Sequence, residues 1–434
     1  MLRRAGFGTS GPQVDAVAGQ DWSAYLDAAL SANPDADPGA VATPMPHAPI
    51  GLVPDGSATK EQLSTFGQEL FAHMQELSAW WMRRMLAVQQ PIHEKLTLVW
   101  HNHFATSVEK VGFAEWMAIQ NQKLRTLHTG DFQTLAQAML TDGAMLIWLD
   151  GYTNTKAAPN ENLSREFMEL FTMGHNNGYT EVDVREGARA LTGWTGMYDQ
   201  IYLSPRDHDD GPKTILGTTG DFNETDFCRL AVNHPESAPF IATKMWQSLA
   251  SDSAPTDAAL GRLVGAYGPN RDLKALTKAV FLDPEFVTAA GTVVNGPVEW
   301  LVGLMRSLAV PMDKAEVMSA CNSVLTVMGQ RPFYPPDVGG WPRGSRWLSS
   351  TSVAARERRR KQSRCRGCAS APARDHVRAP HDREAPGRIQ ADCPALLPDD
   401  RRRRRRAPPP ARADQRRSRG RARSEERRVG KECL

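Results

Sequence analysis

The chain lacks any long apolar run, and it has few cysteines before residue 351. No stretch of about 18 apolar residues occurs among its 434 residues, so a membrane-spanning helix is not expected. Only Cys228 and Cys321 precede residue 351, and they could form one disulfide or remain two free thiols. Strand-like alternation is scarce and no internal repeat stands out. A mainly α fold is therefore the expected class.

The charge of the chain is divided between two unlike regions. Residues 1–350 hold 26 Lys and Arg against 38 Asp and Glu, a net charge of −12. Residues 351–434 hold 26 against 11, a net charge of +15. The acidic first region, here called the body, argues against a nucleic-acid-binding surface spread over the protein. We therefore expect no nucleic-acid partner for the body.

The basic region contains no Phe, Trp or Tyr, and it includes an unbroken arginine run from Arg401 to Arg406. A disordered tail and a nucleic-acid-binding arm are two interpretations of such a composition. Its Arg, Ala and Pro content is also typical of an out-of-frame translation of GC-rich DNA. The final residues, RSEERRVGKECL, resemble translated adaptor or vector sequence. We predict that residues 357–434 form a disordered and artefactual tail.

Apolar residues at spacings of three and four predict helices along most of the body. Their expected ranges are 60–88, 113–127, 132–140, 162–173, 240–249, 271–281, 298–308 and 314–328. Two short segments, Ile201–Leu203 and Thr214–Leu216, could pair as a small β-hairpin near 201–216. We expect residues 1–356 to form one large multi-helix domain.

The segment from Asn160 to Thr195 concentrates carboxylates and arginines in two successive helical patterns. Glu166 and Glu169 are three residues apart and therefore neighbours on a helix. Two adjacent carboxylates can bind a divalent cation or share a proton. Arg185 and Arg189 could lie against them, either as an ion-pair network that fixes the two helices or as part of a catalytic centre. In the second interpretation the catalytic residues are Glu166, Glu169 and Arg189, together with His103.

The segment LTLVWHNHFATS, residues 96–107, carries two histidines in a His-Asn-His motif. On a continuous helix His101 and His103 point in nearly opposite directions, so they could chelate one ion only if the helix ended near His101. On the continuous helix, His103 lies on an apolar stripe. A histidine there is either a hydrogen-bonded residue of the core or a metal ligand or catalytic group.

The segment RDHDDGPKTILG, residues 206–217, is a loop by its Asp, Gly and Pro content. His208 and Asp209 suit a divalent cation, and Lys213 suits an anionic group of a substrate. The alternative is a loop whose side chains cap their own backbone. The spacing differs from that of a phosphate-binding loop, so no nucleotide is implied. A divalent metal is a possible cofactor, and its candidate ligands are His101, His103, His208 and Asp209.

The segment PPDVGGWPRGSRWL, residues 335–348, is rich in Gly and Pro and contains Trp341 and Trp347. These tryptophans could seal the edge of the core, or they could bind substrate by stacking on a sugar or a peptide.

Several of these motifs together resemble a bacterial family known as domain of unknown function 1800. The resemblance covers residues 1–356 and rests on LRRAGFG, HDDGPKTILG and PPDVGGWPRGSRW as well as the segment after Asn160. It implies an exported, periplasmic protein, often encoded beside a sulfatase-like family, and it carries over no activity or cofactor. Family members usually carry the LRRxxFG segment after an export signal. Its position next to Met1 indicates a late start codon or a truncated reading frame.

Two functions follow as hypotheses. The first is a metal-assisted hydrolase with a centre drawn from the histidines and carboxylates above. The second is a non-catalytic exported scaffold that assists the sulfatase-like protein. The enzyme requires that the motifs converge on one pocket.

Overall fold

The computed structural model describes residues 2–8, 11–48, 53–54, 56–197, 200–289, 291–311 and 314–348. The tail predicted for residues 357–434 lies outside these ranges. Within them, none of the helices combines the length and the apolar content that a membrane span requires. Cys228 and Cys321 are both buried, and they form no disulfide with each other.

The body is mainly α-helical, as expected. The helices before residue 150 are α1 (Gly11–Val17), α2 (Trp22–Ser31), α3 (Pro38–Val41), α4 (Lys60–Ala87), α5 (Ile92–His103), α6 (Val108–Val111), α7 (Ala114–Leu127), α8 (Phe132–Leu140) and α9 (Gly143–Trp148). The later ones are the short turn η1 (Gly151–Thr153), α10 (Asn162–Glu166), the π-helix η2 (Phe167–Thr172), α11 (Glu181–Ala190), α12 (Glu224–Asn233), α13 (Ser237–Leu249), α14 (Asp257–Tyr267), α15 (Leu273–Leu282), α16 (Pro284–Thr288), α17 (Pro297–Ser307), α18 (Ala315–Val327) and η3 (Gly344–Leu348).

Each predicted helical range contains a helix, and local signals set several of the ends. Thr180 begins α11 with a capping box, in which its hydroxyl accepts the Asp183 N–H and the Asp183 carboxylate accepts the Thr180 N–H. Gly174, with a φ of 95°, follows η2 in the left-handed conformation that ends many helices. Helices α12 and α14 were not among the predicted ranges.

The two strand segments exist, but the pairing predicted between them is wrong. Strand β1 (Trp194–Met197) pairs with β2 (Gln200–Leu203), and β3 (Lys213–Ile215) pairs with β4 (Thr218–Gly220), both antiparallel. In the second hairpin the connecting residues Leu216 and Gly217 both have positive φ, 50° and 77°. This is the backbone of a tight two-residue hairpin turn, which favours pairing with the next segment along the chain.

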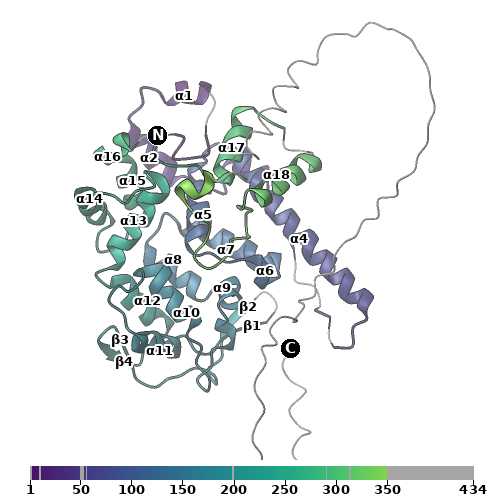
Figure 1. Ribbon diagram of the computed structural model, residues 1–434, viewed down its shortest axis with the longest axis vertical. Helices are drawn as coiled ribbons and strands as arrows, with labels where there is room; N and C mark the ends of the chain where they lie inside the picture. The colour runs from purple at the N-terminus through teal and green to yellow at the C-terminus, as the bar shows by residue number, and fades with distance from the viewer. Residues whose placement is uncertain are drawn as a thin grey trace, which may run out of the picture. The chain divides into compact units, whose positions relative to one another are not determined.

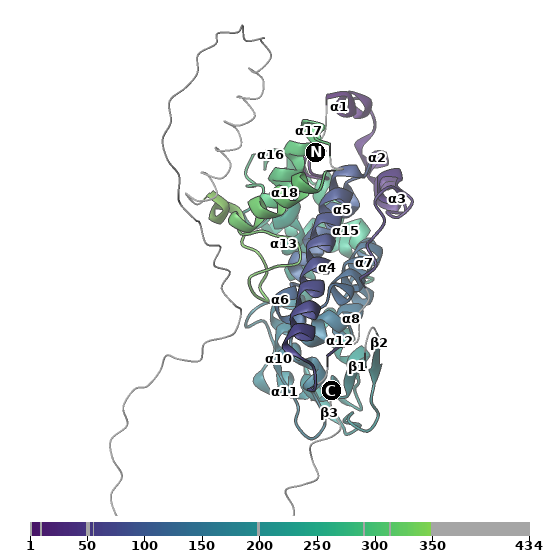
Figure 2. The ribbon, with the colours of Figure 1, turned by 90° about the vertical axis from the view of Figure 1, so that its right-hand side faces the viewer.

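Helix α5 lies between two parts of the core. In Figure 1, helices α13, α14 and α15 lie on one side of α5, and α4, α17 and α18 lie on the other. Leu96 and Trp100 of α5 belong to the first hydrophobic cluster, whereas Leu98 belongs to the second. The turned view in Figure 2 shows α4 alongside α7, with which it is in contact. Because α5 is covered from both sides, its polar side chains are buried, except that of Asn102, which is half-buried.

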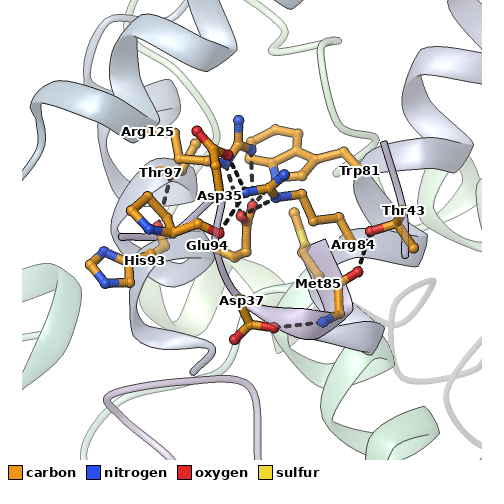
Figure 3. A network of polar contacts seen from close by, with 12 residues as sticks. Asp35, Asp37, Thr43, Trp81, Arg84, Met85, His93, Glu94, Thr97 and Arg125 are labelled. Atoms are coloured by element: carbon orange, nitrogen blue, oxygen red, sulfur yellow. Dashed lines mark hydrogen bonds and ion pairs between the residues drawn. The ribbon is translucent and has the colours of Figure 1, made fainter. Parts of the chain in front are cut away.

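Glu94, in the first turn of α5, is the centre of a buried ion-pair network (Figure 3). It accepts hydrogen bonds from Arg84 at 2.7 Å, from Arg125 at 2.8 and 3.0 Å, and from the Trp81 indole at 2.8 Å. Burial alone would raise the pKa of this carboxyl, but the two guanidinium groups hold it at about 2. Arg84 has a second carboxylate partner, Asp35, at 2.7 Å. The network joins α4, α5 and α7.

Candidate functional site

Helix α5 continues through His103, so the two histidines of the HNH motif point to different sides of it. The His101 ring packs against Trp81 and Trp341, with ring centroids 5.3 and 5.4 Å away. Its Nε2 accepts the Phe333 N–H at 3.3 Å. Burial lowers the pKa of His101 to about 3. His101 is therefore a neutral histidine of the core at pH 7.

His103 joins α5 to the π-helix. Its Nε2 donates to the Phe171 carbonyl at 2.9 Å, which fixes the proton on that nitrogen. Burial, and next the positive charge of Lys244, lower the pKa of His103 to about 3. The HNH motif and the segment after Asn160 thus meet at this hydrogen bond.

The carboxylates of the π-helix region pair with partners other than the predicted arginines. Glu169 accepts a hydrogen bond from the Tyr179 hydroxyl at 3.2 Å and is bonded to His175. Burial, and next the charge of Glu169, raise the pKa of the half-buried Glu166. Arg165 connects the two helices by two hydrogen bonds of 2.7 Å to Glu181. Arg185 and Arg189 therefore do not form the ion pairs with Glu166 and Glu169 that the sequence predicted.

Arg189 instead holds the loop after β2. Its guanidinium donates to both oxygens of Asp209, at 2.8 and 3.2 Å, which lowers the pKa of that carboxyl. His208 donates from Nδ1 to the Thr192 carbonyl at 2.8 Å. The side chains of His208 and Asp209, two of the four predicted metal ligands, thus hold this loop against the end of α11.

Lys213 is buried, and its ammonium group is bonded to the loop itself. It donates to the carbonyl oxygens of Asp209 at 2.6 Å and of Gly211 at 2.9 Å. Burial lowers its pKa. These contacts match the alternative in which the loop satisfies its own backbone.

The predicted metal ligands are not brought together. Among the residues that the structure describes, no three His, Cys, Asp or Glu side chains form a group that could hold a metal ion. His101 lies among aromatic rings, His103 on the π-helix, and His208 with Asp209 in the distant loop. The HNH, RExxE and HDxGxK motifs therefore do not share one metal centre in this part of the chain.

The HNH motif does meet the closing Gly/Pro-rich loop, through the asparagine between its histidines. The Asn102 Oδ1 accepts the Trp341 N–H at 2.6 Å. Gly340, with a φ of 82°, lies so close to α5 that a Cβ there would come within 2.4 Å of Asn102 oxygens. Only glycine fits this approach.

A cavity of about 70 Å³ lies where α5, the end of α13 and η3 meet. It is open to solvent on one side. Its lining is formed by Leu98, Val99, Asn102, Gln247, Ser248, Asp252, Val293, Val294, Gly296, Glu299, Gln330, Pro342, Arg343, Gly344 and Trp347. Of the residues predicted to bind substrate, Trp347 lines this cavity, whereas Trp341 contacts its wall through Asn102.

Arg343 is the cation of the cavity wall. Its Nη1 donates one long hydrogen bond, 3.5 Å, to the Gln247 side-chain oxygen. In the described ranges, no carboxylate oxygen lies within 4.0 Å of its guanidinium. Burial lowers the pKa of Arg343. This guanidinium is thus half-buried and poorly paired.

Lys244 lies one turn before Ser248 on α13 and is a second cation close to the cavity. Its ammonium is 5.1 Å from the centre of the Phe240 ring. It has no ion pair with any carboxylate of the described part of the chain. Burial, and next the charge of Arg343, lower the pKa of Lys244 to about 8.

Two carboxylates also line the cavity. Glu299 is paired with the buried Lys95. Asp252 accepts the Val294 N–H at 3.0 Å. The neighbouring Arg4 donates to the Val293 carbonyl at 3.2 Å and so fixes the same segment of the wall. The cavity therefore has an uneven distribution of charge, with its unpaired cations on the side of α13 and η3.

Sequence reasoning missed the polar residues of this cavity. Asn102 and Arg343 lie inside motifs that were singled out, but attention went to the histidines and tryptophans beside them. Gln247 lies in the amphipathic helix α13 and Asp252 comes shortly after it, and neither carries a local signal. Only the tertiary structure brings these four residues together around one cavity.

These features define a mainly α protein with a polar cavity that is lined by residues of both its HNH motif and its closing Gly/Pro-rich loop. The chain matches the model of DUF1800, a family of proteins of unknown function, over residues 1–405, and it belongs to that family. The match continues past residue 356, to which the motif resemblance extended. No curated protein and no solved structure matches the chain.

Proposed function

We propose that the protein binds a small anion, or the anionic group of a larger ligand, in the cavity between α5, α13 and η3. One observation carries the proposal: the Arg343 guanidinium lines this cavity without a carboxylate partner in the described structure. A guanidinium offers five N–H donors in a planar arrangement that matches carboxylates and phosphates.

The surroundings of another arginine sharpen this argument. Arg306 is also desolvated, but its Nη1 donates to three carbonyl oxygens, those of Met85, Leu86 and Val88, at 2.9 to 3.0 Å. Arg343 has a single acceptor at 3.5 Å. Arg343 is half-buried, so it keeps N–H donors that no described residue fills. A bound anion would supply acceptors for them.

Lys244 supports the same assignment. Its positive charge and that of Arg343 repel each other, which contributes to the lowered pKa of Lys244. Electrostatic interactions are stronger in a buried site than in water, because the effective dielectric constant is lower. An anion bound beside Arg343 would therefore relieve the repulsion between the two cations.

The wall also offers neutral donors of the kind that fix the orientation of a ligand. Asn102 lines the cavity and uses its oxygen to accept the Trp341 N–H, which leaves its NH₂ group as an available donor. Gln247 likewise uses its oxygen for Arg343. Either amide could therefore donate from nitrogen to a bound anion.

Calorimetric titration of the full chain with acetate and with phosphate tests the proposal. We expect Arg343→Met to weaken the affinity for the bound anion at least about tenfold, since a charge-assisted partner is lost. The matched control is Arg346→Met, which removes the same charge from an exposed arginine three residues later. Both variants keep the basic residues after position 350. Nonspecific binding of anions to those residues is therefore equal in the two variants and does not affect their comparison. Equal affinities in the two variants, or no binding by the unaltered chain, would overturn the proposal.

The functions predicted from the sequence stay predictions. A metal-assisted hydrolase would bind a stoichiometric divalent ion, which elemental analysis of the purified chain can measure. An exported scaffold for a sulfatase-like protein would co-purify with that partner. Anion binding is compatible with either, because a hydrolase can act on an anionic substrate and a scaffold can hold an anionic ligand.

A further inference from the structure

Asp252 is the second charged group of the cavity that forms no ion pair in the described ranges, although both Arg4 and Arg343 lie within electrostatic reach of it. Its Oδ2 accepts the Val294 N–H at 3.0 Å. Across the described ranges, no side-chain nitrogen of Lys, Arg or His comes within 4.0 Å of its carboxylate. Asp252 lies against Gly344, where a Cβ would come 3.2 Å from the carboxylate carbon. Gly344 directly follows Arg343, so the two charges face the same small space from neighbouring positions.

The two charges influence each other without forming an ion pair. The negative charge of Asp252 opposes the lowering of the Arg343 pKa by burial, which places them within electrostatic reach. Their charged atoms are nevertheless more than 4.0 Å apart. A simple anion beside Arg343 would be attracted by the guanidinium and repelled by Asp252. A ligand that carries both signs of charge would satisfy both residues.

We infer that the ligand is a small zwitterion with its carboxylate and ammonium on neighbouring atoms, as in an α-amino acid. The carboxylate binds Arg343 and the ammonium binds Asp252. This inference rests on the proposed function and adds the chemical class of the ligand to it.

Glycine is the smallest member of this class, so it is the first ligand to test. Apolar side chains, among them Leu98, Val99 and Val294, also line the cavity, and a small aliphatic side chain of the ligand would contact them.

Titration of the full chain with three matched ligands tests the inference: glycine, acetate, which lacks the ammonium, and methylammonium, which lacks the carboxylate. We expect glycine to bind at least about tenfold more tightly than acetate, and methylammonium not to bind measurably. Asp252→Asn keeps an acceptor for the Val294 N–H but removes the charge. This variant should lose the preference for glycine while still binding acetate. The control, Asp257→Asn, changes an exposed residue at the start of α14 and should keep the preference.

The outcomes separate the two proposals. If acetate or phosphate binds and glycine binds no more tightly, the zwitterion is excluded and the anion site stands. If none of acetate, phosphate and glycine binds, the anion site itself is wrong. Should Asp252→Asn fail to fold, the comparison of the three ligands on the unaltered chain still decides.

Discussion

The Glu94 network and the cavity beside Arg343 pair their arginines in opposite ways: Arg84 and Arg125 are buried and fully paired, whereas Arg343 is half-buried and poorly paired. Glu94 accepts four hydrogen bonds from Arg84, Arg125 and Trp81, all between 2.7 and 3.0 Å. Arg343 makes one hydrogen bond of 3.5 Å and no ion pair with a described residue. In the first region the guanidinium groups are fully paired by described residues, whereas in the second Arg343 has a single distant acceptor, Gln247.

This difference separates a structural group from a binding group. A buried charge that is fully hydrogen-bonded holds secondary-structure elements together. Its removal leaves its partners buried without a counter-charge, which destabilises the fold. A desolvated charge with free donors gains from any ligand that supplies acceptors. The same residue type, arginine, therefore takes two roles that only its surroundings distinguish. The predictions below probe each side of this comparison.

The largest effect is expected at the structural side. Glu94→Gln should lower the free energy of unfolding by about 3–5 kcal/mol, because it leaves the Arg125 guanidinium buried without a carboxylate. Urea unfolding measures the change. Glu61→Gln, in the exposed first turn of α4, serves as the control and should leave the midpoint unchanged. A small loss for Glu94→Gln would mean that the network contributes little to the fold.

A smaller effect is expected from His103, which is buried near the two unpaired cations. Its pKa, about 3 in the folded protein, lies below the usual value of 6.5, so the unfolded chain binds the proton first. Stability is then complete above pH 6.5 and falls as the pH drops toward 3. His103→Asn keeps a donor for the Phe171 carbonyl and should reduce this slope by up to about 1.4 kcal/mol per pH unit. Urea unfolding of both proteins at several pH values between 4 and 7 gives the two slopes. Equal slopes of unfolding free energy against pH in His103→Asn and the unaltered chain would contradict the burial of a neutral His103.

On the binding side, loss of a charge should hardly affect the fold. Arg343→Met breaks no ion pair, so we expect the free energy of unfolding without ligand to change by less than about 1 kcal/mol in either direction. Arg346→Met gives the reference value. Should Arg343→Met destabilise the chain as strongly as Glu94→Gln, the comparison between the two regions would be wrong.

The smallest effect is the pH dependence of anion binding. Lys244 has a pKa of about 8 and is therefore protonated below that pH and increasingly neutral above it. We expect the affinity for acetate to fall by less than about tenfold between pH 7 and 9, since Lys244 acts only through its charge. Lys244→Met should remove this dependence. A steeper fall that persists in Lys244→Met would point to another titrating group.

Local sequence signals were sufficient for most helices and insufficient for strand pairing. The three- and four-residue spacing placed α8 at Phe132–Leu140 without error, since burial of one face follows directly from that period. The strand pairing was predicted wrongly because a two-residue turn at Leu216 and Gly217 determines which strands pair. Neither residue type by itself indicates such a turn. The π-helix at Phe167–Thr172 was also missed, because its pattern was read with the period of an α-helix.

The candidate site was less predictable than the fold. The sequence pointed to the HNH motif and to the closing loop, and these do meet. It selected His101 and His103, whose apolar surroundings keep them neutral, and passed over Asn102 between them. Whether a polar side chain faces a cavity or an aromatic core depends on residues more than 200 positions away, such as the partners of Asn102 and His101.

The most direct test of the account is a crystal structure of the full chain soaked in selenate, with anomalous diffraction measured at the selenium edge. We predict an anomalous peak in the cavity, within hydrogen-bond distance of the Arg343 guanidinium and on the side of Lys244. A cavity without a peak, or an Arg343 side chain paired directly with Asp252, would contradict the claim that this arginine is held free for a ligand.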